Sequence, residues 1–192
     1  ITYAKGASVL KQLAAYVGED AFLEGSRRYF QRHAYGNTTL TDLLSVLEET
    51  SGRDLSAWSK AWLETSGVNA LTFADGTIRQ DGHLRPHRIP VGAYELGDAG
   101  VARVARVEPD LQGESASLPD DLKTAGLLLV NDDDLAYAKI VLNEEQLAYA
   151  YEHLSTFVDP MPRSLIWSSL WNMTRDGVLP GRRFLDFVSG HA

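Results

Sequence analysis

The spacing of apolar residues changes twice along this 192-residue sequence. In residues 3–63 apolar side chains recur every three or four positions, which predicts amphipathic helices. From residue 71 to residue 142 apolar and polar residues alternate between Gly- and Pro-containing segments, which predicts short strands. The helical spacing returns after residue 142. We therefore expect an α+β molecule in which a small β-sandwich lies between two helical parts.

The first helical part is expected to contain four helices. The predicted helices cover residues 3–17, 20–36, 40–51 and 55–66. Thr39 and Asp42 have the spacing of a capping box at the start of the third helix. The first helix has one apolar stripe, which we expect to be its buried face. This stripe consists of Tyr3, Ala7, Leu10, Ala14 and Val17.

The middle segment is expected to form strands over residues 71–73, 77–79, 89–94, 101–107, 127–130 and 135–142. Asp75-Gly76 predicts a tight hairpin between the first two strands. Asn143 and Gln146 then resemble another capping box, and Pro160 and Pro162 are expected to break the chain before two final helices. We expect three domains, over residues 1–69, 70–142 and 143–192.

Composition excludes several classes of function. The net charge is −8 and the pI about 5.1, so the chain has no basic surface for nucleic acid or for an anionic membrane. There are no cysteines, which excludes disulfides, Cys-based zinc sites and thiol catalysis. No apolar run approaches the ~20 residues that span a bilayer. The start lacks an initiator Met and a signal peptide, which indicates a segment cut from a longer protein; we expect a cytoplasmic location.

The histidines do not predict a metal site. Only His83 and His87 are close in sequence, and Pro86 between them argues against one helix face, so we expect solvated or strand-edge side chains. Asn131 to Asp134 is rich in oxygen ligands but lacks the Gly and the final Glu of an EF-hand loop, so we expect a turn. The sequence contains no H-E-x-x-H, phosphate-binding glycine loop or G-x-S-x-G motif.

The opening segment carries the one remaining candidate. Periodicity alone would make Tyr3 the first apolar residue of a helix stripe. However, the segment resembles the Tyr-x-Lys-Gly motif of the zinc aminopeptidases of the aminopeptidase N family, which are gluzincins with an H-E-x-x-H site. The matching residues are Tyr3, Lys5, Gly6, Ala7, Val9 and Leu10.

Later segments extend the resemblance over essentially the whole chain. Trp58, Trp62 and Gly67 resemble the end of that family's catalytic domain, and the run from Leu129 to Lys139 resembles the late strands of its β-sandwich. The order of helices, sandwich and helices is also the family's. The resemblance is greatest to actinobacterial members, and it implies the tail of a thermolysin-like catalytic domain, a sandwich, and the start of a superhelical domain.

The resemblance implies a role for Tyr3. In the family the matching phenol donates a hydrogen bond to the oxyanion that forms when the peptide carbonyl is attacked, beside a zinc ion. The family's zinc ligands and its amine-binding motif lie upstream of this motif, so we expect this chain alone to bind no zinc and to cleave no peptide. Lys5 receives no chemical role, and Gly6 is expected to permit close packing. The residue preference of the whole enzyme stays open.

A second interpretation also stays open, in which the chain is a non-enzymatic interaction module and Tyr3 is structural. The last helices carry Trp167, Trp171, Phe184 and Phe187, and we expect them to expose apolar patches that favour self-association.

Overall fold

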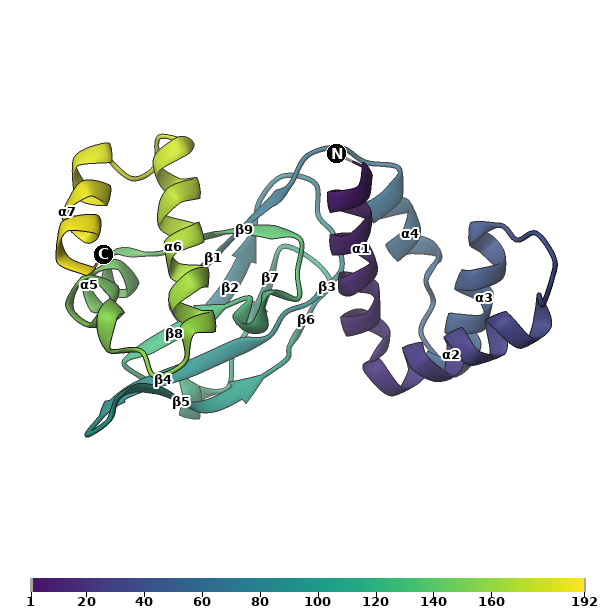
Figure 1. The fold of residues 1–192 in the computed structure, drawn as a ribbon, viewed down its shortest axis with the longest axis horizontal. Coiled ribbons are helices and arrows are strands. Elements are labelled where there is room, and N and C mark those ends of the chain that lie inside the picture. The colour runs from purple at the N-terminus through teal and green to yellow at the C-terminus, as the bar shows by residue number, and fades with distance from the viewer. Residues whose placement is uncertain (1, 192) are drawn as a thin grey trace.

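The computed structural model describes residues 2–191, so Ile1, the expected cut point, lies outside the described residues. Helices occupy the two ends of the molecule and strands its middle (Figure 1). We call residues 2–63 the first helical part, residues 69–141 the strand region, and residues 144–191 the last helical part. The expected α+β class is confirmed.

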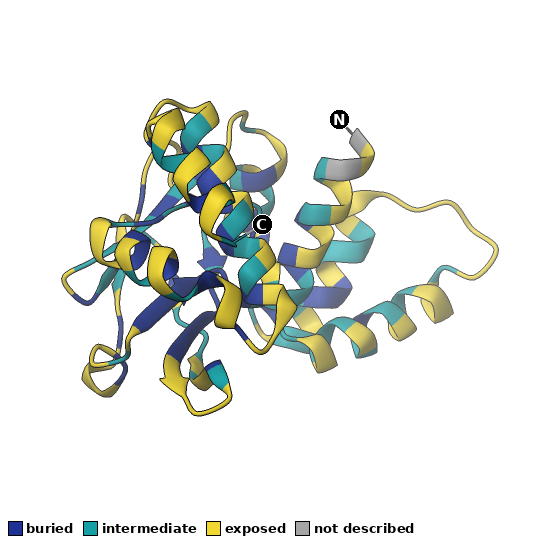
Figure 2. Cartoon of the chain, turned by 60° about the vertical axis from the view of Figure 1, so that its left-hand side comes forward, coloured by how far each residue is buried: buried dark blue, intermediate teal, exposed yellow. Residues whose placement is uncertain are grey.

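The first helical part contains α1 (Thr2–Val17), α2 (Glu19–Arg32), α3 (Leu40–Ser51) and α4 (Ser56–Leu63). The predicted Thr39–Asp42 capping box is present at the start of α3. Gly52 ends that helix in the left-handed conformation. Figure 2 shows exposed and intermediate residues along α2, of which Gly25 is buried.

The strand region contains β1 (Asn69–Ala74), β2 (Thr77–Gln80), β3 (His87–Arg88), β4 (Val91–Gly97), β5 (Gly100–Val107), β6 (Asp110–Leu111), β7 (Ser115–Ser117), β8 (Leu127–Val130) and β9 (Ala138–Val141). They form sheets with the orders β7-β2-β1-β9, β5-β4-β8 and β3-β6. The predicted Asp75-Gly76 hairpin joins β1 to β2, with positive φ at both turn residues. β9 pairs with β1 in parallel, with Asn69 opposite Ala138.

The last helical part contains α5 (Glu144–His153), α6 (Pro160–Arg175) and α7 (Gly181–His191). The Asn143–Gln146 capping box is confirmed. The predicted break between two helices is present, but it lies before Pro160 and not at the two prolines. Both lie in the first turn of α6, after the N-cap Asp159, where a missing backbone N–H costs no intrahelical hydrogen bond.

Buried apolar residues form two separate clusters among the described residues. The larger cluster joins the strand region to the last helical part and extends from Leu71 to Phe187. The smaller cluster belongs to the first helical part and includes Val9, Trp58 and Trp62. The last helical part therefore shares a core with the strands, whereas the first helical part has its own core.

The apolar stripe predicted as the buried face of α1 is largely exposed, so this prediction was wrong. Ala7 is exposed and Leu10 is 47% exposed, while the helix is buried through Val9, Gln12 and Leu13. The reason is that α1 has apolar residues on two faces. Only one of them is covered by the described residues.

The four residues Asn131 to Asp134 form the predicted turn between β8 and β9, with a short 3-10 segment at Asp132–Asp134. Asp132 is fully buried and accepts hydrogen bonds from Tyr94 Oη at 2.7 Å and Arg103 Nη1 at 2.7 Å. Burial and the neighbouring carboxylate raise the pKa of Tyr94. Gly92 permits this approach, because a Cβ there would lie 2.3 Å from Asp132 Oδ2.

Candidate functional site

Tyr3 lies in the first turn of α1, and its side chain is 96% exposed. The buried Gln12 follows nine positions later, and nine steps of about 100° place two residues on opposite sides of a helix. The phenol therefore extends away from the strand region. Since nothing in residues 2–191 buries it, Tyr3 does not serve the core of this chain.

An apolar groove of about 400 Å³ begins two residues after Tyr3, at Lys5. Its lining comes from α1, α3 and α4, and includes Gly6, Val9, Leu43, Trp58 and Trp62. Lys5 is half-buried at the same groove. The close packing expected at Gly6 is not present among the described residues, because a Cβ at this position would meet nothing within 4 Å.

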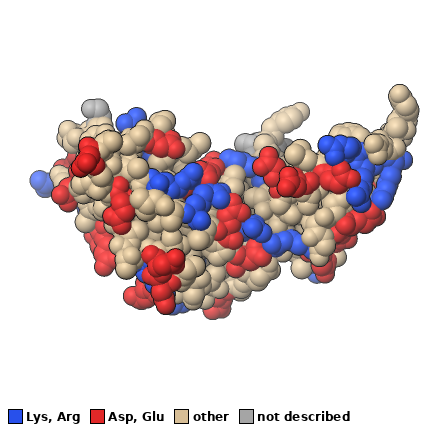
Figure 3. All heavy atoms as spheres, turned by 90° about the horizontal axis from the view of Figure 1, so that it is seen from below, with Lys and Arg blue, Asp and Glu red and all other residues tan. Residues whose placement is uncertain are grey.

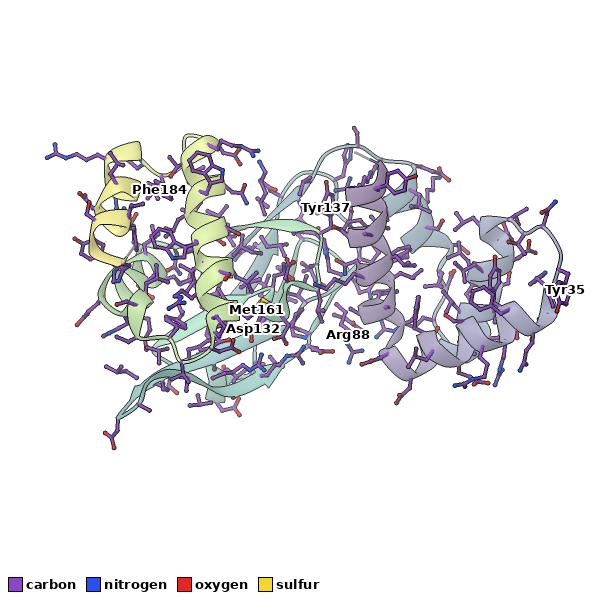
Figure 4. All side chains as sticks on the ribbon, viewed as in Figure 1. Tyr35, Arg88, Asp132, Tyr137, Met161 and Phe184 are labelled. Atoms are coloured by element: carbon purple, nitrogen blue, oxygen red, sulfur yellow. The ribbon has the colours of Figure 1, made fainter. Side chains whose placement is uncertain are left out.

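Polar contacts hold α1 against the strand region. The backbone N–H of Tyr137 donates to Gln12 Oε1 at 3.1 Å, and Tyr137 lies beside α1 (Figure 4). Lys11 Nζ lies 3.7 Å from Asp134 Oδ2. The Arg53 guanidinium, which follows α3, lies 4.6 Å from the centre of the Tyr16 ring and donates to Asp110 Oδ2 of β6 at 3.0 Å, so it links α1 to the strand region. Gln12 is the fully buried member of this set, and its Nε2 has no hydrogen-bond partner within residues 2–191.

The two neighbouring histidines have different environments. His83 is exposed, as expected. His87 lies on the short strand β3 but is 0% exposed, so the expectation of a solvated or strand-edge side chain missed its burial. Neither ring nitrogen has a partner among the described residues. Burial, with a smaller contribution from the Arg85 charge, lowers the pKa of His87 to about 3.

The described residues contain no group of three His, Cys, Asp or Glu side chains that could hold a metal ion. The described residues therefore offer no ligand set for a zinc ion, and the resemblance places the family's zinc ligands upstream of Tyr3. Charged side chains serve ion pairs instead, such as those that Asp133 makes with Arg103 and Arg106. Figure 3 shows that acidic and basic side chains are mixed over the visible surface, so no large patch of one charge sign is present in that view.

The sequence patterns did not reveal Arg85, which is only 2% exposed. Its guanidinium donates to neutral oxygens of residues 61–69, and no carboxylate of the described chain lies within 4 Å of it. A lone arginine in a polar segment carries no signal of burial. The sequence gives one indirect indication, in Trp62, which contacts Arg85 in the fold. A buried tryptophan needs an acceptor for its indole N–H, so a polar segment is expected to pack against it.

No helix within residues 2–191 combines the length and the apolar character that a bilayer crossing requires.

Comparison with known families gives two matches. Residues 1–62 match the model of the peptidase family M1 domain, and residues 127–192 match that of the ERAP1-like C-terminal domain. The matched segments thus lie at the two ends of the chain.

Individual relatives agree with these matches. The aminopeptidase N of Streptomyces lividans is 53% identical over 98% of this chain and 25% of its own length. The aminopeptidase N of Lactococcus lactis subsp. lactis is 42% identical over 41% of this chain and 9% of its own length. The tricorn protease-interacting factor F2 of Thermoplasma volcanium is 38% identical over 37% of this chain and 9% of its own length. The chain spans about a quarter of the length of the first of these relatives.

Proposed function

We propose that this chain belongs to peptidase family M1 and is one part of a zinc-dependent aminopeptidase that releases N-terminal residues from peptides. The observation that carries the proposal is the match to the Streptomyces aminopeptidase N along nearly the whole chain. The zinc ligands would lie elsewhere in the longer protein. Cytoplasmic location is part of the proposal, and cell fractionation tests it.

We assign Tyr3 the role of oxyanion stabiliser. Its exposed phenol, on the face of α1 that the described residues leave uncovered, supports this role. A phenol donates one hydrogen bond, and an oxygen that gains negative charge during attack on a carbonyl accepts that bond more strongly than the starting carbonyl does. Tyr3 would therefore act on the transition state rather than on substrate binding.

Replacing Tyr3 tests this role in the full-length protein that carries the chain. Tyr3→Phe removes only the hydroxyl, and we expect kcat to fall by about 10²–10³-fold while KM changes little. Tyr35→Phe is the matched control, because Tyr35 is also fully exposed and lies at the far tip of the α2–α3 connection (Figure 4). An unchanged kcat in Tyr3→Phe would remove Tyr3 from the mechanism.

The isolated 192-residue chain is expected to be inactive. After incubation with Zn²⁺ and dialysis it should retain no stoichiometric metal, because its described residues lack a ligand set. Metal analysis together with a peptide-hydrolysis assay measures both properties. Tight binding of one zinc per chain would contradict this expectation.

We also propose that the isolated chain associates with itself through apolar side chains on α6 and α7. Of the four aromatic residues expected to be exposed, only Trp171 is more than half exposed. Phe187 is buried in the larger cluster, and Trp167 and Phe184 are partly buried against it, so that part of the expectation was wrong. Leu185 on α7 is also more than half exposed. Sedimentation velocity at increasing concentration tests this, and a monomer throughout would oppose it.

A further inference from the structure

Three consecutive residues of the strand region surround the side chain of Trp62. The indole N–H donates to the Pro86 carbonyl at 3.0 Å. The Arg85 guanidinium lies 5.3 Å from the ring centre, and the His87 ring meets the indole edge-on at 4.9 Å between centroids. Trp62 is itself 0% exposed. We call Arg85, Pro86 and His87 the Trp62 clamp.

Arg85 also joins the end of α4 to the strand region. Nε donates to the Ala61 carbonyl at 3.1 Å, and Nη2 donates to Thr65 Oγ1 at 2.7 Å and to the Ser66 carbonyl at 2.8 Å. Nη1 donates to Asn69 Oδ1 at 2.9 Å. One buried fork thus fixes the whole segment between α4 and β1. A lysine could not reproduce this, because its ammonium is a point charge with three donors.

Trp62 lies under the helix that carries Tyr3. It belongs to the buried cluster that contains Val9 and Leu13, and it lines the apolar groove together with Lys5 and Gly6. The first helical part has no buried apolar core in common with the strands. Its orientation therefore depends on Tyr137, which packs against that cluster, and on a few directional contacts, of which those of the Trp62 clamp are buried.

We infer that the Trp62 clamp is a positioning element for Tyr3, with Arg85 as its principal residue. The inference rests on the proposed function, since it concerns how the Tyr3 hydroxyl is held. The outer surface of a helix lies about 5–6 Å from its axis, so a rotation of α1 by about 10° moves a side chain there by about 1 Å. A misplacement of about 1 Å can cost ~10²-fold in rate.

Kinetics of the full-length protein test the inference. Arg85→Lys keeps the charge and loses the fork, and we expect kcat to fall at least ~10-fold with KM within about 2-fold. Arg79→Lys is the matched control, because Arg79 is exposed on β2 of the same region, and it should leave both constants unchanged. In the Tyr3→Phe protein, adding Arg85→Lys should not lower kcat further, because Arg85 acts by placing the Tyr3 hydroxyl and that hydroxyl is already absent.

A milder pair of variants keeps the test valid if Arg85→Lys does not fold. Thr65→Ala removes one acceptor of the fork and should lower kcat, and Thr65→Ser should restore it because the hydroxyl is retained. Folding of each variant is checked by thermal unfolding.

Three results would overturn the inference: a folded Arg85→Lys protein with the original kcat, a Thr65→Ala protein with the original kcat, or losses that multiply in the Tyr3→Phe background. The Tyr3→Phe protein alone tests the proposed function. If its kcat is normal, the proposed role of Tyr3 fails and this inference fails with it. If its kcat falls while the clamp variants are normal, only this inference fails.

Discussion

Protonation of His87 should make the fold sensitive to mildly acidic pH. A histidine in an unfolded chain has a pKa near ~6.5, whereas burial lowers the pKa of His87 to about 3 in the folded chain. Between these two values the unfolded chain binds one more proton than the folded chain does. Stability is therefore complete above the unfolded pKa and falls as the pH is lowered through this window.

The size of the effect follows from the two pKa values. Within the window, each pH unit costs about 1.4 kcal/mol. Between pH 7.5 and pH 5, His87 should lower the free energy of unfolding by about 2 kcal/mol, because the loss becomes appreciable only below pH ~6.5. For a chain of this size that corresponds to roughly 4–8 °C in Tm.

His87→Leu isolates this contribution. The two residues have similar volumes, and neither ring nitrogen of His87 has a partner within the described residues, so the substitution breaks no hydrogen bond there. At pH 7.5 we expect the free energies of unfolding of the variant and the original protein to differ by less than about 1 kcal/mol. Between pH 7.5 and pH 5 this difference should change by about 2 kcal/mol in favour of the variant.

Urea unfolding of the 192-residue chain at several pH values from 7.5 to 5 measures the difference. His83→Leu is the control, because His83 is exposed four residues earlier, and its pH profile should follow the original. If the original and the His87→Leu profiles run parallel, His87 does not remain neutral inside the fold and the reasoning is refuted.

Three further predictions concern other buried and exposed groups. Gly92→Ala should destabilise the chain by more than about 2 kcal/mol in urea unfolding, because its Cβ would overlap the Asp132 carboxylate. Gly113→Ala is the control and should stay within about 1 kcal/mol of the original protein, because nothing lies within 4 Å of a Cβ there. Equal effects of the two substitutions would contradict the overlap. Asp132→Asn should cost about 1.5–3 kcal/mol by the same method, because Tyr94 and Arg103 lose a charged acceptor while Arg103 keeps its ion pair with Asp133. No measurable cost would show that the buried charge is dispensable. Tyr3→Phe should leave Tm of the 192-residue chain unchanged in calorimetry, since the phenol is exposed; a clear drop would make Tyr3 structural.

The sequence predicted the local structure well where the residue types at a position strongly favour one backbone conformation. The capping boxes at Thr39 and Asn143 and the turn at Asp75-Gly76 are examples. Pro160 was misread because proline both ends a preceding segment and starts a helix, and the sequence pattern alone does not separate the two.

Contacts between distant segments could not be predicted in this way. The exposed stripe of α1 and the burial of His87 depend on which faces meet, and the periodicity of one segment carries no information about its partner. The same applies to Arg85, whose acceptors lie 16 to 24 residues earlier in the chain. For Tyr3, the candidate came from a family motif, and its role remains a proposal.

The parallel pairing of β1 with β9 determines how far apart the two helical parts lie. An antiparallel partner would return the chain to the end of the sheet where it entered, but a parallel partner delivers it to the opposite end. The two helical parts consequently sit at opposite ends of the same strand pair, as Figure 1 shows. The four paired residues of each strand span about 13 Å. Inserting or deleting two residues in both strands would therefore change the distance between the two helical parts by about 7 Å.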